Sequence, residues 1–161
     1  MCCLAGEITT VVEVGQQAPD FELTDTEQNT VRLSDFRGKP VVLFFFPMAF
    51  TGVCELQLSQ HQHRLQDFTD LGAQVLAISA DQRAAQKEFA GRCGVNGFPI
   101  LSDARHNVIK AYGVYREAGP VNERATFILG KEGNIVYKFI EAAPGNWQGI
   151  DVELEQLRKL Q

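Results

Sequence analysis

The sequence lacks the features of several large classes of protein. Its longest apolar run, residues 41–46, is far shorter than the ~18 residues that a membrane-spanning helix needs. No cluster of lysine and arginine is present, and the formal net charge of -5 argues against a nucleic-acid partner. A glycine-rich phosphate loop is also missing. We therefore expect a protein that does not associate with a membrane, does not bind nucleic acid and carries no bound cofactor.

Cysteine is scarce, and its arrangement predicts neither structural disulfides nor a metal site. The four cysteines are Cys2, Cys3, Cys54 and Cys93, with no CxxC pair and no zinc-type spacing to histidine. The N-terminal residues have no basic stretch followed by a long apolar one, as a secretory signal would. We expect a cytoplasmic protein in a reducing compartment.

His61 and His63 are the histidine pair most suggestive of a metal site. Two positions apart on a helix, they point to different sides and cannot chelate one ion together. We therefore expect no metal, and we expect both histidines on a solvated helix face.

The order of apolar and polar segments predicts one α/β domain over residues 1–161, with residues 1–10 as a flexible tail. Two short strands flank a polar turn at residues 27–29, and the apolar run 41–46 predicts a central strand that ends at Pro47. The other elements expected are a helix over 54–71, a strand over 73–80, a helix capped by Ser79 or Asp81 and ending near 93–94, an extended segment over 98–103, a helix over 103–112, a hairpin over 124–140 and a helix over 150–160.

Strand–helix–strand units imply parallel central strands covered by helices, and the late hairpin adds an antiparallel edge. This is a thioredoxin-like fold: a central mixed sheet flanked by helices, with an N-terminal β-hairpin extension.

Cys54 lies where the central strand passes into the following helix. The first turn of a helix offers unpaired N–H groups and roughly half an elementary positive charge, and both favour a thiolate over a thiol. Because the thiolate is the nucleophile, this position predicts a reactive cysteine. Thr51 stands where a dithiol redox protein would carry a second cysteine, so the TxxC pattern favours chemistry by one thiolate.

The stretch "PMAFTGVC", residues 47–54, resembles the PxxxTxxC motif of the peroxiredoxins. With "FPILSD", "AYGVYREAG" and "NERATFIL", the run "FFFPMAFTGVC" is similar to the AhpE-type one-cysteine class of actinobacteria, close to the bacterioferritin-comigratory class. The similarity extends from Val14 to about Phe139.

This resemblance implies a thiol-dependent peroxidase for hydrogen peroxide and organic hydroperoxides, with a role in antioxidant defence. Cys54 would be the peroxidatic residue, which becomes a sulfenic acid. Arg124 would hold the sulfur and the peroxide oxygens, and Pro47 would shield the pocket from water. The hydroxyl of Thr51 would donate to the sulfur or accept from the O–H of the substrate. One departure is Gln57, because many relatives carry glutamate three residues after the cysteine, whereas here the glutamate is Glu55.

Several routes for reducing the sulfenic acid stay open. Ser59 occupies the position where the bacterioferritin-comigratory class often carries its resolving cysteine. The favoured reductant is an external thiol: a low-molecular-weight thiol, a thioredoxin or a glutaredoxin-like protein. Cys93 is a candidate resolving residue, and so are Cys2 and Cys3 on the tail. We also expect a homodimer paired through the face that carries the active-site loop.

Two other functions remain as alternatives. One is thiol–disulfide exchange on the same fold, which needs a second nearby thiol. The other is a binding module in which Cys54 has no catalytic role. The joint presence of Thr51, Cys54 and Arg124 favours the peroxidase, because a binding module has no need of that set.

Overall fold

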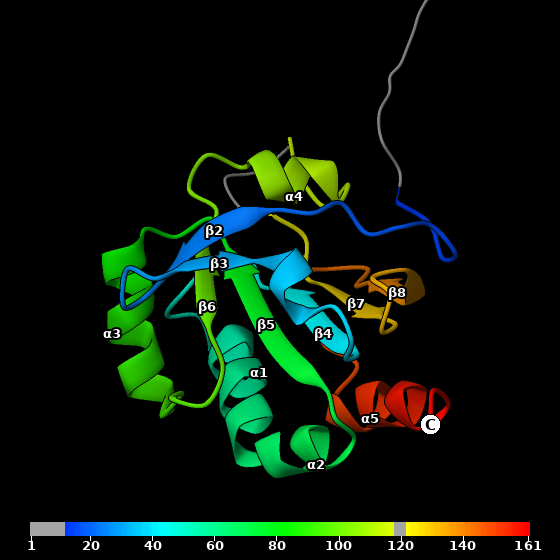
Figure 1. Ribbon diagram of the computed structural model, residues 1–161. Coiled ribbons are helices and arrows are strands. Elements are labelled where there is room, and N and C mark those ends of the chain that lie inside the picture. Colours follow the sequence, from blue (N-terminus) through cyan, green and yellow to red (C-terminus); the bar gives the residue numbers. More distant parts are fainter. Residues whose placement is uncertain (1–11, 118–121) are drawn as a thin grey trace, which may run out of the picture.

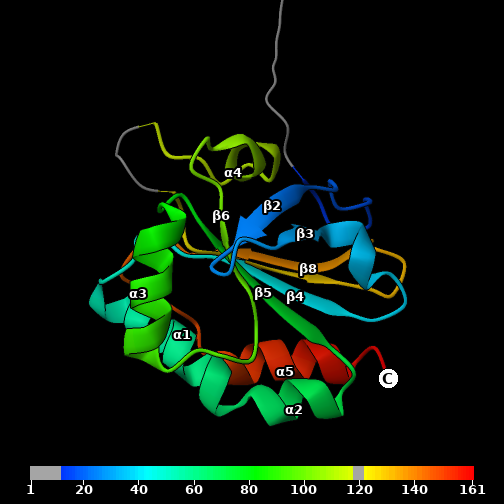
Figure 2. The same cartoon turned by 60° about the vertical axis from the view of Figure 1, so that its left-hand side comes forward.

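The computed structural model describes residues 12–117 and 122–161 and contains a seven-stranded mixed sheet (Figures 1 and 2). The expected tail at residues 1–10, together with Cys2 and Cys3, lies outside the described residues. The strands are β2 (Glu22–Asp25), β3 (Thr30–Arg32), β4 (Val41–Phe45), β5 (Gln74–Ser79), β6 (Ile100–Ser102), β7 (Ala125–Leu129) and β8 (Ile135–Ile140).

The strand order is β3-β2-β6-β5-β4-β7-β8. The three central strands β4, β5 and β6 are parallel, while the hairpin β2–β3 extends one edge and β7–β8 extends the other in antiparallel pairing. The thioredoxin-like fold expected from the sequence, with its N-terminal hairpin, is thereby confirmed.

The helices lie on both faces of the sheet. They are α1 (Gly52–His63), α2 (Leu65–Asp70), α3 (Arg83–Cys93), α4 (Asn107–Ala111) and α5 (Ile150–Arg158), with a short 3-10 turn at Leu33–Phe36. Helices α1, α2, α3 and α5 contribute side chains to one core layer, and α4 contributes to the layer on the other face. None of these described helices combines the length and the apolar character that a bilayer crossing requires.

Strand β4 is the central element of both layers. Val41, Leu43 and Phe45 pack into the layer under α4, whereas Val42 and Phe44 pack under α1 and α5, as the twofold alternation of a strand dictates. All five residues are buried, which explains why the sequence shows an unbroken apolar run here.

Three details differ from the sequence-based expectations. The helix expected over residues 103–112 is the short α4, which begins only at Asn107, after the N-cap residue His106. The helix expected over residues 54–71 is two helices that begin at Gly52 and are separated at Arg64, whose backbone leaves the helical region. Arg64 pairs there with Asp67 at 2.6 Å and with Asp151 of α5 at 3.2 Å, and these contacts hold the bend against α5. Helix α3 begins after Gln82, so neither Ser79 nor Asp81 is its N-cap.

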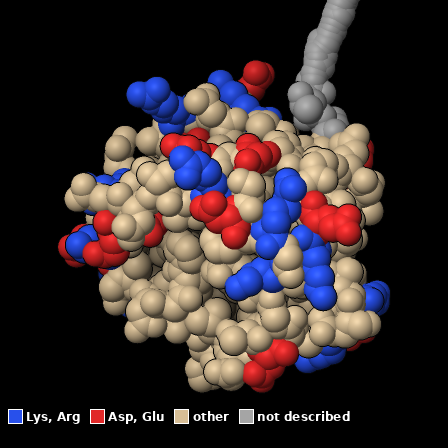
Figure 3. Space-filling view, in the orientation of Figure 1, with Lys and Arg blue, Asp and Glu red and all other residues tan. Residues whose placement is uncertain are grey.

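The charged side chains on the face shown in Figure 3 are mixed in sign, with lysine and arginine lying among aspartate and glutamate. This face therefore offers no broad basic surface of the kind that binds nucleic acid.

Candidate active site

The loop between β4 and α1 is tied to its neighbours on both sides. The N–H of Ala49 donates to Asp81 Oδ2 at 2.8 Å, and the ring of Phe50 packs against Phe89 of α3 with centroids 5.2 Å apart. Phe50 has φ 66°, a left-handed conformation that costs energy for a bulky residue. These contacts stabilise the strained turn, and α1 begins directly after it at Gly52.

Cys54 is the third residue of α1 and is fully buried. Its sulfur accepts a hydrogen bond from Nη2 of Arg124 over 3.3 Å. The N-terminal end of a helix and a guanidinium therefore both present positive charge to one sulfur atom. This combination favours a negatively charged sulfur and any transition state in which charge grows on it.

Arg124 comes just before β7 and is only 2% exposed. Its side chain is fixed by Nε and Nη2, which donate to the carbonyl oxygen of Pro144 at 3.1 and 2.7 Å. Nη1 donates to Oε1 of Gln57 at 2.5 Å. Three elements, α1, β7 and the loop before α5, thus set the position of one guanidinium.

Thr51 is the N-cap residue of α1, yet its side chain does not cap the helix. Its hydroxyl donates to the carbonyl oxygen of Met48 at 2.8 Å. The hydroxyl proton is therefore committed within the loop, and the oxygen lone pairs are what Thr51 can offer to a molecule in the pocket.

A pocket of about 280 Å³ opens beside these groups. Its walls come from the β4–α1 loop, from the first turn of α1, from Arg124 and from the loop before α5: Pro47, Met48, Thr51, Gly52, Val53, Arg124, Pro144 and Gly145. The structure thus brings together Pro47, Thr51 and Arg124 around a small cavity, with Cys54 bonded to Arg124.

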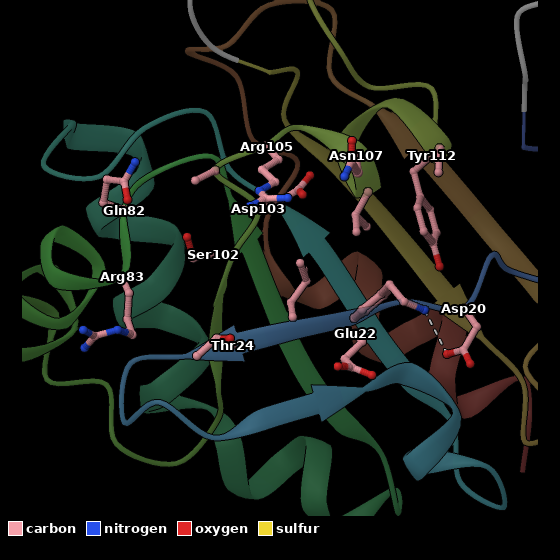
Figure 4. Close-up of a pocket in the computed structure, with 15 residues that line it drawn as sticks. Asp20, Glu22, Thr24, Gln82, Arg83, Ser102, Asp103, Arg105, Asn107 and Tyr112 are labelled. Carbon is pink, nitrogen blue, oxygen red and sulfur yellow. Dashed lines mark hydrogen bonds between the residues drawn. The ribbon is translucent and has the colours of Figure 1, made fainter.

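A larger hollow of about 680 Å³ lies between β2, β6 and α4 (Figure 4). Figure 4 shows acidic and basic side chains on its walls, including Glu22, Asp103, Arg83 and Arg105. The carboxylate of Asp103 already has a main-chain partner, because its Oδ2 accepts a hydrogen bond from the N–H of Ile109 at 2.7 Å. With no cysteine on its walls and no convergent set of polar groups, this hollow is a weaker candidate than the pocket at Cys54.

Glu55, the carboxylate adjacent to Cys54, is directed away from it. Its Oε2 accepts from Nε of Arg92 in α3 at 2.6 Å. Arg92 therefore compensates the charge of Glu55. The residue three positions after the cysteine, Gln57, is neutral.

Cys93 lies at the end of α3 and is half-buried. Its carbonyl oxygen accepts a long hydrogen bond of 3.5 Å from the hydroxyl of Ser59 in α1. Burial raises the pKa of the Cys93 thiol, which disfavours its reactive thiolate form. Both Cys54 and Cys93 are free thiols in this structure.

The expectation that His61 is solvated is wrong. His61 is fully buried, with Nδ1 2.7 Å from the carbonyl oxygen of Gln57 and Nε2 2.7 Å from Oε1 of Glu153 in α5. His63 is exposed, as expected. Within residues 12–117 and 122–161, no group of three His, Cys, Asp or Glu side chains is placed to hold a metal ion.

The sequence reasoning missed the contribution of Pro144. Two of the bonds that fix Arg124 end on its main-chain carbonyl, which every residue type possesses, so no residue pattern could have revealed it. The anchoring role of Gln57 was also not foreseen, although its position after Cys54 had been noted as unusual.

Comparison with known proteins gives consistent results. The model of the AhpC/TSA family matches residues 14–138. The chain is 40% identical over 128 residues to alkyl hydroperoxide reductase E of Mycobacterium tuberculosis, covering 78% of this chain and 83% of that protein. It is 34% identical over 160 residues to a chloroplastic 2-cysteine peroxiredoxin of Chattonella marina, covering 93% and 81%.

A similar solved structure is that of peroxidoxin BcpB from Mycobacterium tuberculosis. It superimposes with a TM-score of 0.84 at 29% sequence identity, over 93% of this chain and 99% of that one. The likeness thus extends over nearly the whole chain.

Proposed function

The chain belongs to the AhpC/TSA family of peroxiredoxins and is a thiol-dependent peroxidase, and we propose that Cys54 is the residue that attacks the peroxide. The observation that carries this proposal is the 3.3 Å contact between the Cys54 sulfur and Nη2 of Arg124, in the first turn of a helix and beside a small pocket.

In this proposal the Cys54 thiolate attacks one oxygen of a hydroperoxide. A sulfur–oxygen bond forms, the oxygen–oxygen bond breaks, and the second oxygen takes a proton and leaves as water or as an alcohol. Cys54 is oxidised to a sulfenic acid and the peroxide is reduced by two electrons. Hydrogen peroxide and organic hydroperoxides are both proposed as substrates, because the pocket of about 280 Å³ exceeds the size of hydrogen peroxide.

Arg124 stabilises this reaction because negative charge spreads from sulfur onto both oxygens as the bond breaks. A guanidinium always carries its charge and presents several N–H groups in one plane. Fixed donors aimed at growing charge commonly account for a rate factor of about 10²–10³ each. The unpaired N–H groups in the first turn of α1, where Cys54 lies, add to this effect.

Thr51 and Pro47 have supporting roles in the proposal. Because the hydroxyl of Thr51 donates to Met48, its oxygen is free to accept the O–H of the incoming peroxide. The buried ring of Pro47 forms part of the pocket wall and keeps water from the thiolate.

For the return to the thiolate we propose an external thiol reductant, either a low-molecular-weight thiol or a thioredoxin- or glutaredoxin-like protein. Cys93 is the second candidate, although its raised pKa disfavours attack on the sulfenic acid. Such a reductant implies a reducing compartment, and we propose the cytoplasm.

We also propose that residues 1–161 act as one domain and pair as a homodimer. The exposed apolar side chains Met48, Phe50 and Leu56 lie on the loop and first turns of α1, where pairing would cover them.

The test is to treat reduced protein with one equivalent of hydrogen peroxide in the presence of a sulfenic-acid trap and to measure the intact mass. The proposal expects a trap adduct on Cys54 and none in the Cys54→Ser variant. A loss of two protons without an adduct would assign Cys93, Cys2 or Cys3 as the resolving thiol, after peptide mapping. If Cys54 stays a free thiol, the proposed role of Cys54 fails.

A further inference from the structure

Gln57 holds a buried cation without neutralising it. Its Oε1 accepts from Nη1 of Arg124 at 2.5 Å, and both residues are almost completely buried. An arginine side chain does not lose its proton in proteins, so a full positive charge lies inside the molecule at this point. Buried charges are normally paired with an opposite charge, because desolvating an unpaired one is costly.

The acceptors around Arg124 include no carboxylate. They are the carbonyl oxygen of Pro144, the amide oxygen of Gln57 and the sulfur of Cys54. In the described part of the chain, no acidic side chain lies within 4.0 Å of this guanidinium. Of the three acceptors, only the sulfur of Cys54 can carry a full negative charge.

The carboxylates and the histidine near this pair are bound to other partners, and the one further thiol among the described residues is Cys93. On α1 and α3, Glu55 is bound to Arg92 at 2.6 Å, and Cys93 is half-buried at the end of α3. Between α1 and α5, His61 and Glu153 bind each other at 2.7 Å. After β8, Glu141 accepts from the backbone N–H of Gln148 through Oε2 at 3.0 Å.

We propose that Gln57 is a positioning residue that fixes Arg124 against Cys54 and, being neutral, leaves the guanidinium charge to the sulfur alone. This inference rests on the proposed role of Cys54. A carboxylate at position 57 would fix the guanidinium equally well but would compete with the thiolate for its charge. The neutral amide thus fixes the position of Arg124 without weakening the electric field of the guanidinium at the sulfur.

Two substitutions distinguish these properties. Gln57→Glu adds one negative charge at nearly constant size and keeps the oxygen that binds Arg124. It breaks no other hydrogen bond of the side chain, because Nε2 of Gln57 has no partner among the described residues. Gln57→Met keeps the length of the side chain but removes the acceptor, so Arg124 loses one of its three anchors.

The measurement combines the thiolate ultraviolet absorbance of Cys54 as a function of pH with the rate of reaction with hydrogen peroxide. At a pH where Cys54 of the unmodified chain is half ionised, we expect Gln57→Glu to lower the thiolate fraction about fivefold, as an upward shift of one pH unit gives. Its rate per thiolate should stay within about twofold. For Gln57→Met we expect the rate per thiolate to fall about 10- to 100-fold, because misplacement by about 1 Å has such effects.

The Cys54→Ser variant provides the baseline for both signals. If Gln57→Glu titrates as the unmodified chain does, the neutrality of residue 57 has no effect and the inference is overturned. If Gln57→Met reacts at the unmodified rate per thiolate, the positioning role is overturned. Should the unmodified chain show no peroxide reaction that depends on Cys54, the proposed function fails instead, and the absorbance titration still decides the electrostatic part.

Discussion

His61 of α1 and Glu153 of α5 face each other across 2.7 Å in the interior, and both side chains are fully buried. The other ring nitrogen of His61 lies 2.7 Å from the carbonyl oxygen of Gln57, which can only accept a hydrogen bond, so Nδ1 carries a proton. The imidazole is stacked on Phe44 of β4 with centroids 4.2 Å apart. The pair therefore joins the C-terminal helix to the helix that carries Cys54.

We expect strong coupling between His61 and Glu153 in stability. Glu153→Leu alone leaves a buried ring nitrogen without its partner and should lower the free energy of unfolding by about 3–5 kcal/mol, whereas the double variant with His61→Phe should cost much less. Phenylalanine is suited to the site because it can continue the stack on Phe44. Urea unfolding of both single variants and the double variant measures this; costs that simply add would contradict the coupling.

The hydroxyl oxygen of Thr51 should matter for rate more than for folding. Thr51 is exposed, so Thr51→Val should leave the unfolding midpoint nearly unchanged while lowering the rate constant with hydrogen peroxide about 10²-fold. Thr51→Ser keeps the hydroxyl and should recover most of the rate. Stopped-flow kinetics on the three proteins tests this; a valine variant as fast as the unmodified chain would contradict the role of the hydroxyl oxygen.

The Cys93 thiol should be slow to alkylate at neutral pH. Burial raises its pKa, and a neutral thiol is a poor nucleophile, so the rate with iodoacetamide should keep increasing well into alkaline pH. Peptide mass spectrometry at several pH values follows the modification of this one residue. Protein unfolded in urea is the control, since Cys93 should there react as an ordinary thiol; a native rate equal to the unfolded rate would count against the prediction.

Ionisation of the buried Asp103 carboxyl should lower the free energy of unfolding at neutral pH. Burial raises its pKa above the ordinary 3.8, against the opposing effect of the Ile109 N–H. The folded chain therefore holds this proton more tightly than the unfolded chain, and the stabilisation present below 3.8 is lost as the pH rises through the folded value.

Asp103→Asn removes that ionisation and keeps an oxygen for the Ile109 N–H. We expect its stability relative to the unmodified chain to improve between about pH 4 and pH 7, measured by urea unfolding. Asp70→Asn on the exposed surface of α2 is the matched control. A relative stability of Asp103→Asn that stays constant with pH would refute this expectation.

The prediction from sequence succeeded where one local pattern decides the structure. The apolar run before Pro47 could only be a strand buried on both faces, and a proline at its end left few routes except a turn into a helix. The same reasoning placed Cys54 in a first helical turn, and the resemblance to the peroxiredoxins placed Arg124 directly before a late strand, as the structure has them.

It failed where a distant partner decides. A helix face made of Cys54, Gln57 and His61 looks partly polar. The partner that satisfies Nε2 of the buried His61 is Glu153, which lies 92 positions further along the chain. The bend at Arg64 likewise depends on Asp151 of α5. Such pairings are properties of the folded arrangement, and the spacing of residues along one helix carries no trace of them.

The anchoring of Arg124 on the Pro144 carbonyl has a consequence for how this protein can evolve. A main-chain oxygen is supplied by any amino acid, so the loop between β8 and α5 can drift in composition without loss of that acceptor. An insertion or deletion would instead displace the oxygen and release the guanidinium. Selection at this loop therefore acts on its length and backbone conformation. A family member could differ here at every residue and still keep the same chemistry.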